Sequence, residues 1–350
     1  MPRGQRRRMS SISTPRMQQT LAFAWAVLAG VLCLGQGVGC QGSRLIFDFA
    51  PDDRLEETVV LADQPAGFMR QRRKVALIDV SGLIADASVP AVLGGDENPV
   101  SLLAESLRHA ASDHDVRAVV VRVNSPGGGV TASDVMYREL MHFKERTKKP
   151  VVVLMGDVAA SGGFYLACAG DEVIAHPTTI TGSIGVIVQT MNFSEGLRRI
   201  GIHANAITSG PNKTMGSPLQ PMSPEHRALL QGIVDELYAG FITIVETRRP
   251  DLDDETLATV TDGRVVTGAH AAELGLVDRT GDLRDAFAAA KTRAGLERAR
   301  LIKYHRPMDY VGSAYATSAA VSPRALLEVN LPPTLTTQPA FMYLWEPTAW

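Results

Sequence analysis

Short apolar runs alternate with amphipathic stretches from Lys74 onward. The apolar runs are rich in β-branched residues, which predicts strands at 74–80, 118–123, 151–155, 172–175, 186–189 and 204–208. The stretches between and after them have helical spacing, which predicts helices at 102–111, 131–147, 161–169, 223–247, 268–274 and 283–294. Strands that alternate with helices form βαβ units, so we predict an α/β fold with a mainly parallel sheet and helices on both faces.

Two of these helices begin with capping signals. Thr131-x-x-Asp134 fits a capping box, and Ser223-Pro224 combines an N-cap residue with proline at the first helical position. Both signals support helix starts near the predicted positions.

The N-terminus has the layout of a targeting segment. Five arginines up to Arg16 precede an apolar run at 21–34, which is the order of a secretory signal. The run has 14 residues, and a membrane span needs about 20. Gly37-Val38-Gly39-Cys40 resembles a lipobox, although Gly37 stands where leucine is usual. Three outcomes stay open: lipidation at Cys40, an uncleaved N-terminal anchor, and a soluble secreted form.

The arginines of this segment stay on the cytoplasmic side of the membrane under the positive-inside rule. We therefore predict that residues 1–40 are a signal peptide or anchor and that 41–73 are a linker. The remainder, a domain at 74–295 and a tail at 296–350, is placed on the extracytoplasmic (periplasmic) side of the cytoplasmic membrane.

Composition excludes several classes of protein. Hydrophobic residues make up 45% of the chain and charged residues 21%, which is typical of a folded protein. Residues 48–350 hold 29 Lys and Arg against 37 Asp and Glu, so the body is acidic. Nucleic-acid binding needs a basic face, and we expect none. The body contains a single cysteine, Cys168, in an apolar stretch, so it has no disulfide framework and the thiol is expected to be buried.

Three glycine-rich turns each follow an apolar run. The first, 124–129 (NSPGGG), lacks the spacing of a phosphate loop, but its glycines let backbone N–H groups face a developing negative charge. In the second, Ser161 begins a helix and is followed by Gly162 and Gly163, at the sheet edge where α/β folds place their sites. Ser161 is therefore either a helix N-cap or a nucleophile. The third turn, 181–186 (TGSIGV), carries no signal by itself.

A serine nucleophile needs a base. None of the eight histidines lies in a motif that ties it to Ser161; His176, at the end of a predicted strand, is the nearest candidate. Lys213 lies in a loop and is the single lysine between Lys149 and Lys291. A loop lysine is usually a solvated charge, and a lysine acts as a base only when it is neutral, which requires desolvation.

Taken together, the motifs resemble the signal peptide peptidase A family of Ser–Lys serine peptidases, which has a ClpP/crotonase-like fold of repeated ββα units. The resemblance covers about residues 74–295 and rests on five motifs in the family's order: VNSPGGGV (123–130), AASGGFYLACAGDEVIA (159–175), TGSIGV (181–186), NKTMGSP (212–218) and DGRVVTGAHAAELGLVD (262–278). Two positions differ from the family: Asn212 stands where an aromatic residue is usual, and Phe164 replaces a common tyrosine.

The resemblance implies roles for individual residues. Ser161 matches the nucleophile, and Lys213, 52 residues later, matches the general base. Ser183 matches the residue that orients the lysine amine, and Gly128 and Gly162 match the backbone donors of the oxyanion hole. The implied substrates are signal-peptide remnants or other short, apolar, unfolded peptides, and no metal or cofactor is implied. Short members of the family form ring-like homo-oligomers in which Ser and Lys come from neighbouring protomers.

Other functions remain open at this stage. A crotonase-like acyl-CoA enzyme shares the fold, but export and the serine at 161 argue against it. A ClpP-like protease would need a histidine near Gly185 or Val186, and there is none. An inactive membrane-associated scaffold of the same fold is a further alternative. The tail at 296–350 is predicted to be loosely packed or engaged by a partner, and autoinhibition or self-processing by this tail is a hypothesis.

Overall fold

The computed structural model describes residues 55–63, 72–86, 98–306, 311, 313–316 and 341–345. The predicted signal peptide, the proposed lipidation site Cys40 and the anchor lie outside these residues. The described residues therefore belong to the body of the chain.

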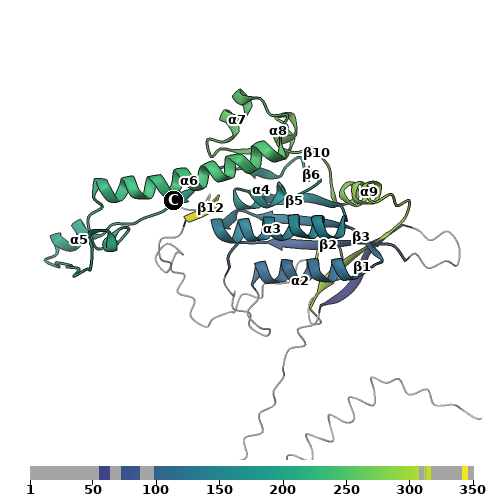
Figure 1. Ribbon diagram of the computed structural model, residues 1–350, viewed down its shortest axis with the longest axis horizontal. Coiled ribbons are helices and arrows are strands. Elements are labelled where there is room, and N and C mark those ends of the chain that lie inside the picture. Colours follow the sequence, from purple (N-terminus) through teal and green to yellow (C-terminus); the bar gives the residue numbers. More distant parts are fainter. Residues whose placement is uncertain are drawn as a thin grey trace, which may run out of the picture. The chain divides into compact units, whose positions relative to one another are not determined.

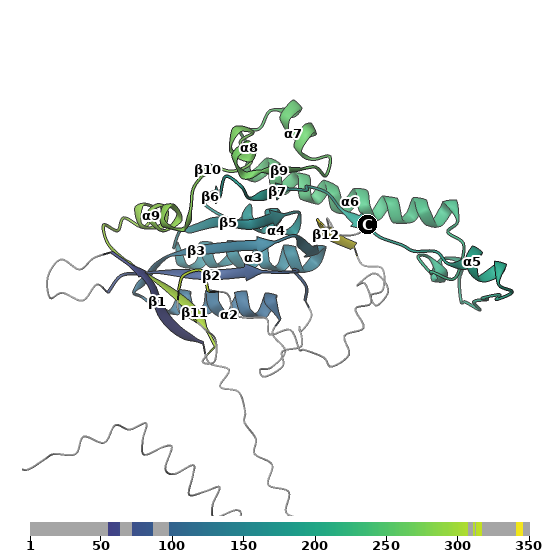
Figure 2. The ribbon, with the colours of Figure 1, turned by 180° about the vertical axis from the view of Figure 1, so that it is seen from behind.

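A mainly parallel sheet forms the centre of this body (Figures 1 and 2). Its core consists of β2 (Lys74–Ser81), β3 (Val116–Ser125), β5 (Val151–Ala160) and β6 (Glu172–Ala175), each parallel to its neighbour. The short β10 (Arg279–Thr280) is parallel to β6, and β11 (Arg300–His305) is parallel to β2. This arrangement confirms the predicted α/β fold.

Two groups of elements complete the edges of the sheet. On one side, β1 (Glu56–Ala62) pairs antiparallel with β11. On the other, β7 (Ile180–Gly182) continues beside the end of β5 and pairs antiparallel with β9 (Val265–Thr267). A smaller sheet joins β4 (Gly127–Gly129), β12 (Phe341–Leu344) and β8 (Ile187–Val188).

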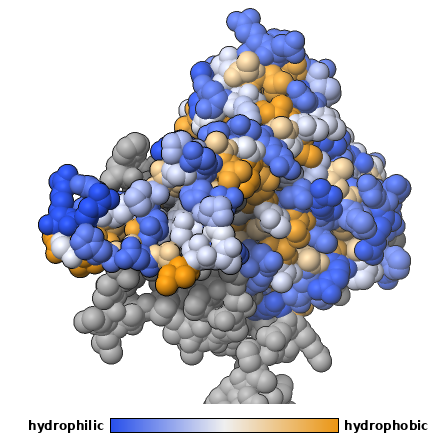
Figure 3. Space-filling model, turned by 60° about the vertical axis from the view of Figure 1, so that its left-hand side comes forward, coloured by the Kyte–Doolittle hydropathy of each residue, from blue (hydrophilic) through white to orange (hydrophobic). Residues whose placement is uncertain are grey.

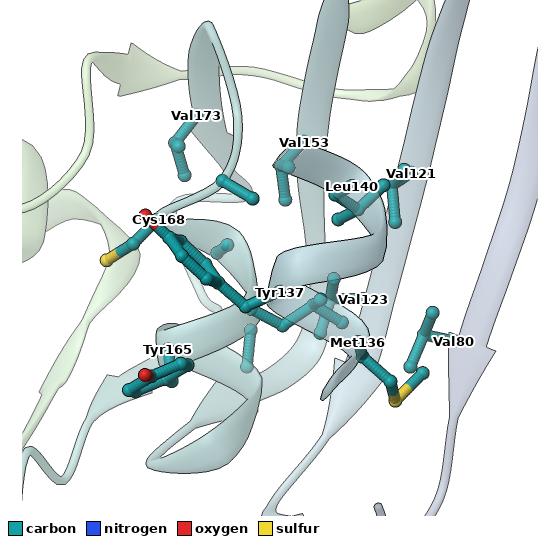
Figure 4. Close-up of a cluster of buried hydrophobic side chains, with 14 of the residues drawn as sticks. Val80, Val121, Val123, Met136, Tyr137, Leu140, Val153, Tyr165, Cys168 and Val173 are labelled. Atoms are coloured by element: carbon teal, nitrogen blue, oxygen red, sulfur yellow. The ribbon is translucent and has the colours of Figure 1, made fainter. Parts of the chain in front are cut away.

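Helices cover both faces of the large sheet because strand residues alternate between two apolar clusters. Alternate residues of β2, β3 and β5 pack with α2 (Pro99–Ser112), α3 (Val130–Thr147) and α4 (Gly162–Ala167). The intervening residues pack with α9 (Leu283–Arg293) on the opposite face. Figure 4 shows the first cluster, in which Met136 and Leu140 of α3 lie against the valines of the sheet. Central strands buried on both faces explain their nearly continuous apolar sequence.

The remaining helices lie toward the β10 end or extend outward. Near that end are α7 (Asp254–Val260) and α8 (Gly268–Glu273) (Figure 1). The long α6 (Pro224–Arg248) packs through Phe241 and Val245, and its N-terminal half extends outward with α5 (Ser194–Arg199). We call residues 189–235 the arm. Among the described helices, α6 is the one long and apolar enough to cross a membrane by length and composition.

Several local predictions differ from the structure. Residues 204–208 form no strand, and Ile207 there is fully exposed. α3 begins at Val130, with Gly129 as its N-cap and no side-chain cap, so the capping box at Thr131 is wrong. The Ser223 cap is confirmed, because its hydroxyl accepts a hydrogen bond from the N–H of His226.

The folded body also extends past the predicted limits of 74–295. β1 lies within the segment assigned to a linker, and β11 and β12 lie within the predicted tail. β1 and β11 pair with each other across more than 230 residues of sequence. A short edge strand of this kind has little local signal, because its partner is distant and one of its faces is solvated.

Candidate active site

Ser161 lies at the turn between β5 and α4 in an unusual backbone conformation. Its φ is 52° and its ψ is −114°, a region that costs a non-glycine residue of order 1–3 kcal/mol. The turn is held by hydrogen bonds from the Ser161 N–H to the Gly182 carbonyl (2.8 Å) and from the Tyr165 N–H to the Ser161 carbonyl (2.8 Å). Strain maintained by surrounding contacts is a feature of functional sites.

The Ser161 hydroxyl makes no hydrogen bond within the part of the chain that the structure describes. The residue is 1% exposed, its Oγ is buried without a partner, and it provides no side-chain cap to α4. Buried hydroxyls normally have partners, because an unmade hydrogen bond costs about 1–3 kcal/mol. The N-cap interpretation of Ser161 is therefore wrong for its side chain.

A bulge in β5 sets the position of this turn. Val123 pairs with Met155, and the next pairing joins Ser125 to Ala159, so extra residues of β5 lie opposite Asn124. The Asn124 side chain fills this irregularity and accepts a hydrogen bond from the Val158 N–H (3.0 Å). The bulge redirects the end of β5 from β6 toward β7.

The glycine after Ser161 lets the chain approach its neighbours closely. A Cβ on Gly162 would lie 2.4 Å from Ser133 Oγ and 3.2 Å from the Gly127 Cα. One on Gly163 would lie 2.7 Å from the Ser125 carbonyl oxygen. No larger residue fits either position without movement of these neighbours, so the two glycine-rich turns meet through backbone atoms.

The first glycine turn forms the strand β4, which is held against Ile84. The Ile84 N–H donates to the Gly127 carbonyl, and the Gly129 N–H donates to the Ile84 carbonyl, both at 2.8 Å. A Cβ on Gly128 would lie 1.9 Å from that Ile84 oxygen. Gly127, with φ of 103°, comes so close to α4 that its Cβ would lie 2.7 Å from the Gly162 nitrogen. Backbone N–H groups near such a junction can stabilise a negative oxygen.

Ser183 directly follows β7, the neighbour of the strand β5 that precedes Ser161. β5 and β7 are parallel and pair Ala160 with Gly182, so the two serines directly follow paired residues. Ser183 is 8% exposed, has a φ of 49°, and donates its N–H to the Arg264 carbonyl (2.7 Å). The third glycine turn therefore lies at the same sheet edge as the other two.

Lys213 lies apart from this cluster. It is exposed, in a short 3₁₀ helix (Pro211–Thr214) of the arm between α5 and α6. A hydrogen bond between His226 Nε2 and the Pro211 carbonyl (3.1 Å) ties this helix to the start of α6. Figures 1 and 2 both show α5 and this end of α6 extending away from α4. Within one chain the structure brings Ser161, Ser183, Gly128 and Gly162 together and leaves Lys213 outside.

His176, the alternative base, has a hydrogen-bond neighbour of its own. His176 is exposed, and its Nδ1 lies 2.8 Å from Thr178 Oγ1 rather than at Ser161.

Cys168 is confirmed as buried, and burial raises the pKa of its thiol to about 11. Across the described residues, no group of three or more His, Cys, Asp or Glu side chains is placed to hold a metal ion.

The strand β12, which lies between β4 and β8, was not predicted from the sequence. Its residues are part of the run PAFMYLWEP at 339–347. A short apolar run bounded by two prolines is a strand signal, and it could have identified this element. The run places Tyr343 among the aromatic side chains of α4 and α6.

Comparisons with known proteins agree on the family. The model of peptidase family S49 matches residues 143–297, which contain Ser161, Ser183 and Lys213, and that of the Clp protease matches residues 72–213. A putative protease of Synechocystis sp. is 38% identical over 226 residues, which are 65% of this chain and 76% of that protein. A putative signal peptide peptidase of Enterococcus faecium is 32% identical, over 66% of this chain and 67% of its own.

Protease 4 of Salmonella typhi is also similar: it is 35% identical over 72% of this chain, but only 40% of that longer protein is covered. The fold, with its Clp-like mainly parallel sheet, agrees with these matches. The chain belongs to peptidase family S49, the signal peptide peptidase A family of serine proteases.

Proposed function

We propose that this chain is a Ser–Lys endopeptidase that cleaves signal-peptide remnants and other short, apolar, unfolded peptides. The observation that carries the proposal is the buried, unpartnered Ser161 hydroxyl on a strained turn, beside two glycine turns that meet through backbone atoms. A reactive hydroxyl beside backbone donors is the arrangement that acyl transfer requires.

The reaction proceeds through an acyl-enzyme. Neutral Lys213 takes the proton of Ser161 Oγ as that oxygen attacks the peptide carbonyl carbon, and the carbonyl oxygen becomes negative. The N–H groups of Gly128 and Gly162 hold this oxygen. The C–N bond then breaks, Lys213 gives its proton to the leaving amine, and Ser161 carries the acyl group. Water, deprotonated by the same lysine, hydrolyses the ester and restores the serine.

Ser183 is a positioning residue in this proposal. Ser183 directly follows β7, whose last residue pairs with Ala160 just before Ser161, which supports a role for its hydroxyl toward a lysine amine that approaches Ser161. A hydroxyl that donates to the neutral amine stabilises the form that acts as a base. Its role is therefore to hold the Lys213 amine toward Ser161.

We infer that Lys213 reaches Ser161 of a neighbouring protomer in a ring-like homo-oligomer. Support comes from its exposed position on the arm and from the absence of a partner for Ser161 Oγ in the described residues. The arm also exposes large apolar side chains: Phe193, Ile200, Ile202, Ile207, Leu219, Leu229 and Ile233. Figure 3, in which the side bearing the arm faces the viewer, shows apolar surface among the polar residues. A head-to-tail ring buries such a surface repeatedly and completes every site.

Attachment to the membrane is proposed for the N-terminal residues. Residues 1–40 retain the charge and apolar pattern of a signal or anchor, with Cys40 as a candidate for lipidation, and they place the body on the periplasmic side. α6 has the length and composition of a span, but its C-terminal half packs on the catalytic body through Phe241 and Val245. We assign its exposed half to contact between protomers.

The proposal is tested with the assembled protein and a serine-reactive fluorophosphonate probe, together with hydrolysis of a quenched fluorescent peptide. The comparison includes Ser161→Ala, Lys213→Ala and, as a control, Arg146→Ala, which removes an exposed cation at the end of α3. Both site variants should lose hydrolysis by about 10⁴-fold or more, with the oligomer intact by light scattering, and Arg146→Ala should not. Near wild-type hydrolysis by Lys213→Ala would contradict the assignment of Lys213 as the base.

A further inference from the structure

The end of β5 leaves the regular sheet before the chain reaches Ser161. β5 pairs with β6 as far as Met155 and with β7 from Val158 onward. In the sheet that the structure describes, no strand pairing includes the two residues between them, Gly156 and Asp157. Backbone groups that leave a ladder need other partners when they are shielded from water. The carbonyls of this segment are therefore the place where the position of Ser161 can be set.

Two buried threonines supply partners for carbonyls of this segment. Thr179 Oγ1 donates to the Gly156 carbonyl at 2.6 Å, and Thr181 Oγ1 donates to the Ala159 carbonyl at 2.6 Å. Both threonines are fully buried. Thr181 lies in β7 and Thr179 directly precedes that strand, so both hydroxyls reach across to β5. A buried hydrogen bond of this kind is a firm constraint, because water cannot readily replace either partner.

Thr181 connects the strands that carry the two serines of the proposed site. It lies two residues before Ser183, and the carbonyl that it binds lies two residues before Ser161. The same strand ends are joined by the Ser161 N–H, which donates to the Gly182 carbonyl (2.8 Å). The Thr181 hydroxyl therefore adds a side-chain bond to the backbone ladder immediately before the strained turn.

The backbone of Thr179 is itself held on both sides. Its N–H donates to the His176 carbonyl (2.9 Å), and its carbonyl accepts a hydrogen bond from the N–H of Gly268 at the start of α8 (2.7 Å). These bonds fix the point from which the Thr179 hydroxyl reaches the Gly156 carbonyl. The irregular part of β5 is therefore tied to two neighbouring elements and not to its own strand alone.

We propose that Thr179 and Thr181 are positioning residues, which hold the end of β5 so that the Ser161 hydroxyl keeps the place from which it attacks. The inference rests on the proposed peptidase function and names two residues that act through Ser161. A strained backbone persists only where its surroundings prevent relaxation. Without the Thr181 hydroxyl, the Ala159 carbonyl loses this partner and the turn can relax. A displacement of the reacting group by about 1 Å reduces catalysis about 100-fold.

The test compares two substitutions at position 181 in the assembled full chain. Thr181→Val keeps the branched shape and removes the donor, whereas Thr181→Ser keeps the donor and removes a methyl group. A methyl group cannot lie as close to the Ala159 carbonyl oxygen as the hydroxyl does, so valine also displaces that carbonyl.

We expect Thr181→Val to lower kcat for a quenched fluorescent peptide about 10–100-fold. KM should change little, because the buried threonine does not meet the peptide. Thr181→Ser should keep most of kcat. A threonine that only filled space would give the reverse order, with serine the more harmful change.

Thr179→Val and Thr179→Ser repeat the comparison at the second threonine and give a result even if Thr181→Val does not fold. Thr147→Val is the matched control. It removes a hydroxyl that donates to the Phe143 carbonyl (2.7 Å) at the end of α3 farthest from the glycine turn, and kcat should not change. A fall in kcat no larger than that of the control at both threonines would overturn the proposal.

The outcomes separate this inference from the proposed function. If hydrolysis depends on Ser161 but kcat follows the lost methyl group and not the lost hydroxyl, the positioning role is wrong and the peptidase stands. If the unaltered chain neither cleaves peptides nor is labelled at Ser161 by the fluorophosphonate, the peptidase proposal fails. The threonines are then judged by hydrogen exchange of the Ser161 amide. Exchange at least about tenfold faster in Thr181→Val than in Thr181→Ser supports the constraint, and equal exchange overturns it.

Discussion

The sheet edge around Ser161 and the arm around Lys213 differ in how they are held. At the edge, three adjacent strand ends fix the two serines and the glycine turns through backbone hydrogen bonds, and Ser161 and Ser183 are buried. In the arm, α5 has no buried residue and α6 buries residues only beyond position 240. The proposed nucleophile is therefore held by its own chain, whereas the position of the proposed base is not fixed by contacts of this kind.

Few contacts hold the outer part of the arm. The Phe193 N–H donates to the Pro218 carbonyl (2.7 Å), and Gln220 Nε2 donates to the Ala204 carbonyl (2.9 Å). Segments with few buried contacts open at low free energy. If the site is shared as proposed, the single chain is inactive until assembly, and proteolysis is restricted to the oligomer.

Hydrogen exchange measures this difference directly. Amides of β5 should exchange at least about 10³-fold more slowly than those of residues 200–222 at protein concentrations that favour the monomer. At concentrations that favour the oligomer, the arm should gain protection and β5 should change little. Equal protection of both regions in the monomer would show that the arm is fixed within its own chain.

Gly162→Ala tests how tightly the edge is built. The new Cβ would meet Ser133 Oγ at 2.4 Å, so the N–H of residue 162 must move, and we expect kcat/KM to fall about 10²–10³-fold, as for loss of an oxyanion donor. Gly240→Ala in α6 is the control, because a Cβ there meets nothing within 4 Å and the position lies outside the arm. Comparable kcat/KM values for the two variants would contradict the proposed close fit.

Asp79→Ala should lower the stability of the sheet without changing the sheet edge at Ser161 or the arm. Asp79 bonds Arg122 through both oxygens at 2.8 Å and Lys303 at 2.6 Å, and all three side chains are less than a fifth exposed. Removing the carboxylate leaves two cations uncompensated and should lower the free energy of unfolding by about 3 kcal/mol. Denaturant unfolding measures the loss, and kcat/KM per folded, assembled molecule should be unchanged. Loss of hydrolysis without a loss of stability would contradict a purely structural role for Asp79.

Ser183→Ala should have the smallest effect. Loss of one hydrogen bond to the lysine amine should lower hydrolysis at neutral pH about tenfold. The sign of its pH effect follows from the protonation state: without the hydroxyl the neutral amine is less favoured, so the acidic limb of the pH–rate profile moves to higher pH. Ser183→Thr should recover part of the activity. A uniform loss at every pH would indicate a structural role only.

The sequence predicts the centre of the fold well. The strand at 172–175 is found at those residues, and the helices are found within about three residues of their predicted limits, because burial on both faces and helical spacing are local signals. The strands β1, β11 and β12 were not predicted. The pairing of β1 with β11 depends on distant residues, whereas the apolar run that forms β12 carries a strand signal of its own. The strand at 204–208 was predicted from β-branched residues that have no neighbouring strand to pair with.

The candidate site also combines features that the sequence predicts with features that it does not. Its glycines and serines are visible in the sequence because close backbone approach permits few other residues, as at Gly162 and Gly128. The exposed loop position of Lys213 agrees with the expectation for a loop lysine, but local sequence does not say which surface such a lysine meets. The rings of Tyr165, Phe241 and Tyr343 come from α4, α6 and β12, and only the folded chain brings them together.

Mixing two inactive variants tests the shared site most directly. Ser161→Ala retains Lys213, and Lys213→Ala retains Ser161, so a ring assembled from equal amounts of both contains some interfaces with an intact pair. Random assembly into a head-to-tail ring predicts about one quarter of wild-type peptide hydrolysis. Each variant alone should show almost none, although light scattering finds it assembled. Mixed oligomers that remain as inactive as either variant would contradict a site shared between protomers.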